Sequence, residues 1–282
     1  MKWYTDYLST YEKPYSELPP RLTDRVKKRI KQLQAGNPLV SVVVIAHNEE
    51  SRIFPCLWSI SENQCLFCIE IIVVNNHSTD NTENILKELG VRYYNEEKKG
   101  PGFARQCGLN YAKGKYCLCM DSDTIYPPFY IATMTDALRQ DGVVAAYALW
   151  SFLPNKDYSP MGLFLYEAMR DIYFNIQHIQ RPELNVRGMV FGFRTNTARQ
   201  VGFRTDIIRG EDGSLALELK EYGRIKFVRN RKARAITGYG TISADGSLFN
   251  SFRKRAAKGF KNLTSLFHSK EKYEDEDSNL IK

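Results

Sequence analysis

The chain has 282 residues, a net charge of +8, 43% apolar residues and six cysteines. This length suits one large α/β domain with short extensions, and no apolar run approaches the roughly 20 residues of a membrane-spanning helix. The N-terminal residues lack the apolar core of a secretory signal, so we expect the protein in the cytoplasm or peripherally on the inner face of the membrane, with reduced cysteines.

Basic residues gather in three stretches, at residues 21–31, 224–234 and 253–261. Such stretches predict anionic partners, for which a nucleotide diphosphate, an acidic lipid surface and nucleic acid are the candidates. Charge alone does not choose among them.

The N-terminal half alternates strands and helices. Residues 1–36 are predicted to form an arm with a short basic helix at 24–33, and Asp80 with Glu83 resembles a capping box that opens a later helix. Apolar, strand-like runs occur at residues 41–46, 69–74, 91–94 and 116–120. Because helical patterns separate these runs, we expect an α/β fold with a mostly parallel sheet flanked by helices.

The C-terminal half is less regular. It predicts a strand at 143–150 and an aromatic helix at 161–179, followed by turn-rich sequence. Residues 249–267 repeat apolar side chains every three or four positions among lysines and arginines, which predicts a basic amphipathic helix, and an acidic tail ends the chain.

Two carboxylates follow a buried strand in Asp121-Ser122-Asp123. At the carboxyl end of a parallel strand they can reach one ligand volume, and oxygen ligands of this kind suit Mg²⁺ or Mn²⁺. A turn or a helix cap is the alternative interpretation. A second acidic pair, Glu211-Asp212, stands at the start of a predicted helix, where it either caps the helix or supplies a general base.

The glycine-rich stretch at residues 100–104 resembles a dinucleotide-binding fingerprint, which would indicate an NAD-dependent oxidoreductase. Such a fingerprint normally follows the first strand, whereas two strand–helix units precede it here, so this interpretation is disfavoured. Arg105 is predicted to bind a phosphate or a carboxylate, although spacing alone is equally compatible with a surface arginine.

Five features in chain order resemble the family 2 inverting glycosyltransferases. They are the strand ending in Ala46-His47-Asn48-Glu49, the loop at 75–82, residues 104–108 leading to 112–114, Asp121-Ser122-Asp123, and Gly202-Phe203 before Glu211-Asp212. The resemblance implies a GT-A fold, a nucleotide diphosphate sugar donor and a Mn²⁺ or Mg²⁺ cofactor. We expect one glycosyltransferase domain at 37–230, with a nucleotide-binding half (37–124) and an acceptor half (125–230), followed by a C-terminal segment (231–282).

The resemblance also assigns roles. Asp212 is expected to be the catalytic base and Asp123 the metal ligand. Arg105 is expected to neutralise charge on the departing diphosphate. The residues expected to bind the nucleotide sugar are Ala46, Asn48, Glu49, Asn76, Ser78, Arg105, Asp121, Ser122 and Glu211. Many relatives have Asp-Asp where this chain has Asn75-Asn76, so the contact there becomes an amide hydrogen bond and the nucleotide stays open.

The expected acceptor is a glycan or lipid-linked molecule of cell envelope polysaccharide biosynthesis. The QxxRW signature of processive synthases is absent from the sequence, which favours the addition of one sugar per encounter. Residues 249–267 either pack on the domain or hold an anionic membrane surface. We expect no nucleic-acid partner, and the rival class is a non-catalytic nucleotide or nucleic-acid binding module.

Overall fold

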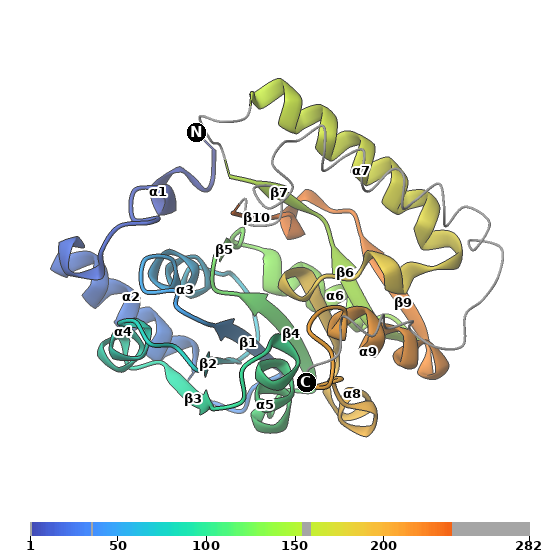
Figure 1. Ribbon diagram of the computed structural model, residues 1–282, viewed down its shortest axis with the longest axis horizontal. Coiled ribbons are helices and arrows are strands. Elements are labelled where there is room, and N and C mark those ends of the chain that lie inside the picture. Colours follow the sequence, from blue (N-terminus) through green and yellow to red (C-terminus); the bar gives the residue numbers. More distant parts are fainter. Residues whose placement is uncertain (1, 35, 154–158, 239–282) are drawn as a thin grey trace.

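The computed structural model describes residues 2–34, 36–153 and 159–238, and the predicted helix at 249–267 and the acidic tail lie outside these ranges. A seven-stranded sheet in the order β3-β2-β1-β4-β8-β6-β9 forms the centre of the protein (Figure 1). Its strands are β1 (Val40–Ala46), β2 (Ile69–Asn76), β3 (Arg92–Glu96), β4 (Tyr116–Asp121), β6 (Val143–Ala148), β8 (Phe191–Arg194) and β9 (Arg224–Val228).

A second, three-stranded sheet and the helices complete the fold. The small sheet has the order β5-β10-β7, formed by β5 (Thr124–Ile125), β10 (Ala235–Thr237) and β7 (Trp150–Phe152). The helices are α1 (Thr5–Leu8), α2 (Pro20–Leu33), α3 (Ile53–Ser61), α4 (Thr82–Leu89), α5 (Pro101–Tyr111), α6 (Tyr130–Leu138), α7 (Pro160–Gln180), α8 (Thr195–Val201) and α9 (Glu211–Leu219).

The mostly parallel sheet is confirmed. β1, β2, β3 and β4 pair in parallel, β8 runs antiparallel between β4 and β6, and β6 pairs in parallel with β9. In the register of β1, Ala46 lies beside Asn75 and Ile45 beside Asp121. The carboxyl ends of β1, β2 and β4 therefore meet at one edge of the sheet, which is where ligands bind in such folds.

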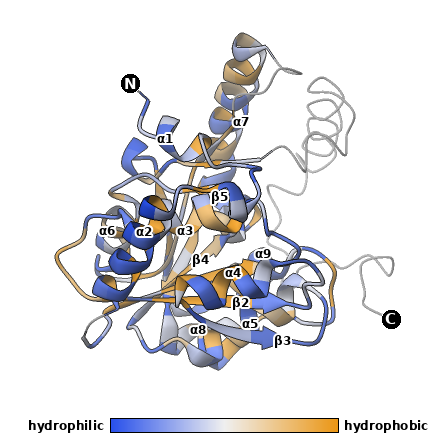
Figure 2. Cartoon of the chain, turned by 90° about the vertical axis from the view of Figure 1, so that its left-hand side faces the viewer, coloured by the Kyte–Doolittle hydropathy of each residue, from blue (hydrophilic) through white to orange (hydrophobic). Residues whose placement is uncertain are grey.

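The strands of the central sheet form much of the hydrophobic core. Every residue of β2 is buried, and in β1 only Ile45 is partly exposed, which explains their near-continuous apolar sequence. Figure 2 shows hydrophobic residues along the central strands and hydrophilic residues on the outer side of α2. Within the described ranges, no helix combines the length and the apolar character that crossing a membrane requires.

Two local predictions were wrong. The capping box is absent because α4 begins at Thr82, whose backbone N–H bonds to Asp80, while the Glu83 carboxylate binds Tyr93 and Lys87. The strand predicted at 143–150 is two strands in different sheets. β10 lies beyond residue 230 and pairs with β5 and β7.

The predicted N-terminal arm packs against α3. Tyr7 is buried, and its hydroxyl donates to the Glu62 carboxylate over 2.8 Å. The helix α2 begins at Pro20 rather than at residue 24, with proline in the first turn, where its missing N–H costs nothing. All six cysteines are free.

Candidate active site

The loop after β1 is tied to the loop after β2. Asn48 has a positive φ of 56°, an arrangement that Asn tolerates better than most residues. Its backbone N–H donates to Ser78 Oγ over 3.0 Å, and its side-chain oxygen accepts from the backbone of Thr79 over 2.8 Å. The backbone of Glu49 likewise donates to Thr82 Oγ1. The structure therefore brings Asn48, Glu49 and Ser78 together at the edge of the sheet, and their predicted binding role stays a prediction.

Asn76 is part of a hydrogen-bond network with the loop before α5. Its amide nitrogen donates to the carbonyls of Glu96 and Lys98 over 3.2 and 2.7 Å, and its amide oxygen accepts from the Gly100 backbone over 2.9 Å. Both N–H groups are used, and the side chain is only 5% exposed. Asn76 thus holds the loop that leads into α5, and its predicted contact with a nucleobase stays a prediction.

Asp121 ends β4 and faces a buried arginine. Arg105 Nη2 lies 2.6 Å from Asp121 Oδ1, and its Nη1 donates to the Met120 carbonyl. Ser122 is 3% exposed, so its side chain is not offered to a ligand. The predicted binding role of Ser122 would have to rest on its backbone.

Asp123 is held from three sides. Its Oδ1 accepts from the hydroxyls of Thr124 and Thr237 over 3.0 and 3.4 Å, and its backbone carbonyl accepts from Tyr11 over 2.9 Å. A Cβ atom on Gly238 would lie 3.7 Å from the other carboxylate oxygen, Oδ2. The N-terminal arm and β10 therefore both reach this loop.

Arg105 also contacts the second acidic pair. Its Nε lies 3.2 Å from Asp212 Oδ1, while its side chain is 2% exposed. Neither atom has hydrogen-bond geometry to any described residue, so the contact is an ion pair and leaves Asp212 Oδ1 without a hydrogen bond. Arg105 therefore pairs with two carboxylates, those of Asp121 and Asp212, and its guanidinium joins the two acidic loops.

Gly188 makes room for this ion pair. It lies in the 3-10 turn Gly188–Val190, beside both side chains of the pair. A methyl group at this position would overlap the guanidinium of Arg105 and lie 2.6 Å from Asp212 Oδ2. Only glycine fits between the two side chains.

Burial without full compensation marks the acidic residues. Burial raises the pKa of Glu49 to about 8, with Asp123 and Asp121 adding to the shift and Arg52 opposing it. Burial likewise raises the pKa of Glu211 to about 8, with Asp212 adding and Arg105 opposing.

The two principal aspartates shift in the same direction. Burial and the nearby charge of Asp121 raise the pKa of Asp123, and the hydrogen bond from the Thr124 hydroxyl opposes this rise. Burial also raises the pKa of Asp212, and Arg105 is the main opposing influence. Although burial alone would lower it, these carboxylates keep the pKa of Arg105 well above its ordinary value. The site holds more negative charge than its arginines offset.

This excess fits a divalent cation. Carboxylate and hydroxyl oxygens are what Mg²⁺ and Mn²⁺ prefer. Among the described residues, no group of three or more His, Cys, Asp or Glu side chains is placed to hold an ion alone. The residues therefore suit an ion that takes its remaining ligands from a bound diphosphate and water.

Sequence reasoning missed Gly188, Tyr11 and Thr237. Nothing in a single sequence marks a glycine as the only residue that fits beside a distant ion pair. Tyr11 and Thr237 lie 112 and 114 positions from Asp123, well beyond any local pattern.

Solved structures with this fold are known. A mannosyltransferase from Pyrobaculum calidifontis, solved with GDP-Man and Mn²⁺, has a TM-score of 0.58 and 18% identity, covering 84% of this chain and 72% of its own. The architecture and the acidic loops at the sheet edge define a GT-A fold protein.

The sequence places the chain more closely. The model for glycosyl transferase family 2 matches residues 41–202, and the chain belongs to that family. An Escherichia coli chondroitin synthase is 27% identical over 68% of this chain and 28% of its own length. The E. coli enzyme named UDP-Glc:alpha-D-GlcNAc-diphosphoundecaprenol beta-1,3-glucosyltransferase WfaP is 29% identical over 45% of this chain and 51% of its own. The chain thus spans about half or less of these relatives.

Proposed function

We propose that the protein transfers a single sugar from a nucleotide diphosphate sugar to an acceptor hydroxyl, with inversion at the anomeric carbon and with a divalent metal ion. The observation that carries the proposal is the Arg105 bridge, because it brings the Asp121 loop and Asp212 to one place. One acidic loop then serves the donor and the other the acceptor.

The donor would lie over the carboxyl ends of β1 and β4. Ala46, Asn48 and Glu49 would line the base and ribose site, Asp121 would accept from a ribose hydroxyl, and Ser78 supports Asn48 from the next loop. The nucleotide stays open, because the P. calidifontis structure contains GDP-Man and the name of WfaP specifies UDP-Glc. The amide network of Asn76 supports this pocket from behind.

Asp123 would hold Mn²⁺ or Mg²⁺ together with the diphosphate of the donor. When bound, the ion would neutralise negative charge that develops on the leaving diphosphate. Arg105 would contribute its positive charge from behind the carboxylates rather than by touching a phosphate, since it is buried and paired with Asp121 and Asp212.

Asp212 would act as the general base. Its Oδ1 is buried and has no hydrogen bond within the described residues, so it is able to accept the proton of an incoming hydroxyl. Arg105 opposes the rise of the Asp212 pKa that burial causes and so favours the ionised carboxylate that a general base needs. Glu211, with its raised pKa, would stay partly neutral beside it.

A glycan or lipid-linked molecule is the proposed acceptor. The name of WfaP specifies a diphosphoundecaprenol acceptor, and the chondroitin synthases build a polysaccharide. Both favour a place in cell envelope polysaccharide synthesis, with the protein in the cytoplasm or on the inner face of the membrane. The rival, a non-catalytic nucleotide-binding protein, gives no role to the buried Asp212 Oδ1, which has no hydrogen bond within the described residues.

The experiment is Asp212→Asn, with Asp136→Asn as its matched control because the Asp136 side chain is 70% exposed. We expect Asp212→Asn to bind Mn²⁺ and nucleoside diphosphates normally and to lose about 10²–10⁴-fold in donor turnover, the usual contribution of a general base. Release of nucleoside diphosphate measures turnover, and thermal stabilisation by GDP, UDP and TDP measures binding. Full turnover by Asp212→Asn would refute the assignment, and no turnover by the unaltered protein with any donor would favour the binding protein.

A further inference from the structure

The long helix α7 has its polar and apolar sides reversed. Between residues 161 and 179, every exposed side chain is large and apolar, and each is between 43% and 80% exposed. These side chains, termed the α7 stripe, are Met161, Phe164, Leu165, Met169, Ile172, Ile176 and Ile179.

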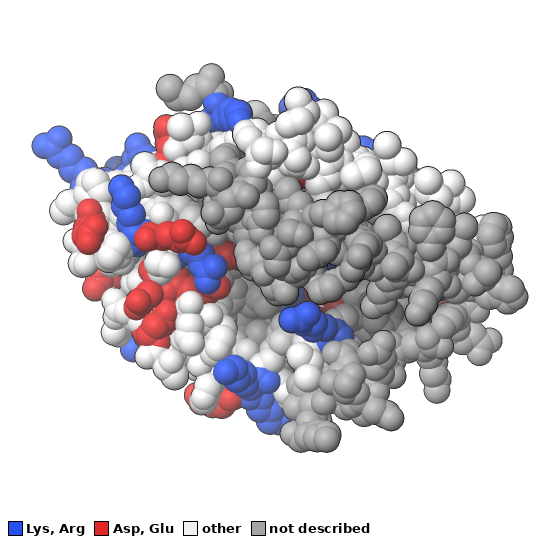
Figure 3. All heavy atoms as spheres, turned by 45° about the horizontal axis from the view of Figure 1, so that its top comes forward, with Lys and Arg blue, Asp and Glu red and all other residues white. Residues whose placement is uncertain are grey.

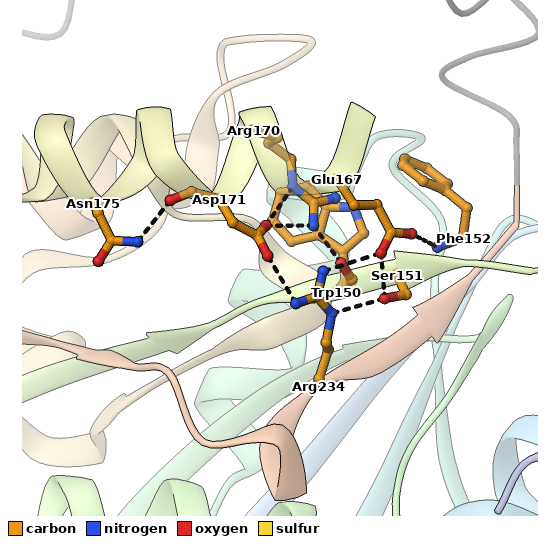
Figure 4. Close-up of polar contacts among 8 residues, drawn as sticks. All are labelled: Trp150, Ser151, Phe152, Glu167, Arg170, Asp171, Asn175 and Arg234. Atoms are coloured by element: carbon orange, nitrogen blue, oxygen red, sulfur yellow. Dashed lines mark hydrogen bonds and ion pairs between the residues drawn. The ribbon is translucent and has the colours of Figure 1, made fainter. Parts of the chain in front are cut away.

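The charged residues of α7 point into the protein (Figure 4). Arg170 donates to Asp171 over 2.8 Å and to the Trp150 carbonyl over 2.5 Å. Arg234, just before β10, pairs with Asp171 over 2.7 Å and with Glu167 over 3.0 Å. The outer side of the helix therefore carries no charge.

This network fixes the orientation of α7. Rotating the helix to bury the stripe would pull the Arg234 ion pairs and the Glu167 bond to the Phe152 backbone apart. The stripe must then be covered by something else, because a contiguous exposed apolar surface of this kind marks an interaction site. Successive members from Met161 through Leu165 to Ile179 are four, four, three, four and three positions apart, a spacing that suits packing against another helix.

The chain itself supplies a matching segment. Residues 239–282 lie outside the described residues. Within them, apolar side chains recur at three- and four-residue steps over residues 249–267, a stretch as long as residues 161–179. The repeating residues are Phe249, Phe252, Ala256, Phe260, Leu263 and Phe267.

The connection is long enough. Ten residues separate Gly238 from Phe249, and such a linker spans up to about 35 Å. The 21-residue helix α7 is about 31 Å long. Since Arg234, four positions before Gly238, already contacts α7, any part of the stripe is within reach.

We propose that residues 249–267 form an amphipathic helix that packs its apolar side chains on the α7 stripe. The lysines and arginines between these side chains then point to solvent, away from the uncharged α7 stripe. The proposal concerns a surface away from the acidic site and does not depend on the proposed function.

Two other occupants are less well supported. A helix that lies on an anionic bilayer carries basic residues beside its apolar face, whereas the charged side chains of α7 point inward. A second copy competes poorly because a tethered segment has an effective concentration in the millimolar range.

The first test is limited trypsin digestion of the full-length protein, which follows cleavage at Arg253, Lys254 and Arg255. We expect slow cleavage in the unaltered protein and at least tenfold faster cleavage in Ile172→Asp and in Phe260→Asp. Gln140→Asp places the same charge at an exposed position away from α7 and should match the unaltered protein. Equal cleavage in all four proteins would overturn the proposal.

The second test uses a photo-crosslinking benzoylphenylalanine at position 172. A crosslink to residues 249–267 within one chain, at monomer mass, supports the proposal. A crosslink at dimer mass, with a dimer that Ile172→Asp dissociates, overturns it in favour of a second copy. Tryptic protection that appears only with phosphatidylglycerol vesicles, together with vesicle flotation lost in Ile172→Asp, overturns it in favour of a membrane.

Discussion

At the scale of single residues, the site depends on one buried arginine between two carboxylates. Removing one partner of such a group leaves an uncompensated buried charge, which is far more costly than the pair is beneficial. The acidic motifs were predictable because Asp121, Asp123 and Asp212 stand in recognisable local patterns. The pairing of Arg105 with two of them was not, since nothing local in a sequence distinguishes a buried arginine from a surface one.

Arg105→Met should move the pH dependence of turnover. Arg105 opposes the rise in the Asp212 pKa, so its loss raises that pKa further and keeps the base protonated to higher pH. The acidic limb of the kcat profile should therefore shift upward, with the melting temperature also lowered. Arg105→Lys, which keeps the charge but loses the planar fork, should shift the limb less. An unmoved limb in Arg105→Met would contradict the role given to Arg105.

Gly188→Ala should impair turnover more than stability. The added methyl overlaps the guanidinium of Arg105, and overpacking of this kind typically costs about 1–3 kcal/mol. Gly90→Ala is the control. An alanine at the Gly90 φ of 64° strains the backbone, and this position is distant from the acidic loops. Turnover and thermal melting should separate the two variants. Equal activity at equal stability would show that position 188 is not needed for the site.

Glu211→Gln should stabilise the metal-free protein at alkaline pH. Because the folded-state pKa of Glu211 is about 8 against an ordinary 4.5, its contribution to stability is fully present below pH 4.5 and is lost as the pH rises through 8. Glutamine avoids this loss, so the variant should melt higher at pH 8.5, by about 2–4 °C for each kcal/mol. Melting curves in EDTA at pH 4.5 and 8.5 measure it. A gain that is equal at both pH values would rule out titration as the cause.

At the scale of elements, the fully buried strands were the easiest to predict. β1, β2 and β4 read as apolar runs because both of their faces are covered by helices. The small sheet could not be predicted, because β5, β7 and β10 have two or three residues each and form no periodic pattern. Yet β10 brings Thr237 to Asp123, so an element invisible to periodicity completes the site.

Tyr11→Phe should weaken metal and nucleotide binding with little change in melting. The variant loses only the hydroxyl that donates to the Asp123 carbonyl. A single hydrogen bond contributes about 0.5–1.5 kcal/mol, which corresponds to a rise of roughly 2–10-fold in the dissociation constant. Calorimetric titration with Mn²⁺ and nucleoside diphosphate measures it, with Tyr4→Phe in the same arm as control. An unchanged dissociation constant would show that the Tyr11 hydroxyl does not contribute to metal or nucleotide binding.

At the scale of the whole molecule, the sequence indicates neither how the two predicted halves are joined nor where the basic stretches lie on the surface. The halves predicted to divide at residue 124 share one sheet, since β8 pairs with both β4 and β6. The basic stretches do not merge on the face in Figure 3: within its described part, Lys and Arg side chains stand apart and Asp and Glu gather at the left. A linear sequence reports the charge of a stretch but not which face receives it.

The fastening of Asp123 by Tyr11 and Thr237 has a bearing on how the protein assembles. Contacts across 112 and 114 positions are costly to form early, because closing so long a loop costs chain entropy before other contacts within it offset that cost. The central strands can pair before these contacts form. A nascent chain would thus pair β1, β2, β3 and β4 well before the ribosome releases Thr237, and the fastening of the Asp123 loop would be among the last contacts to form.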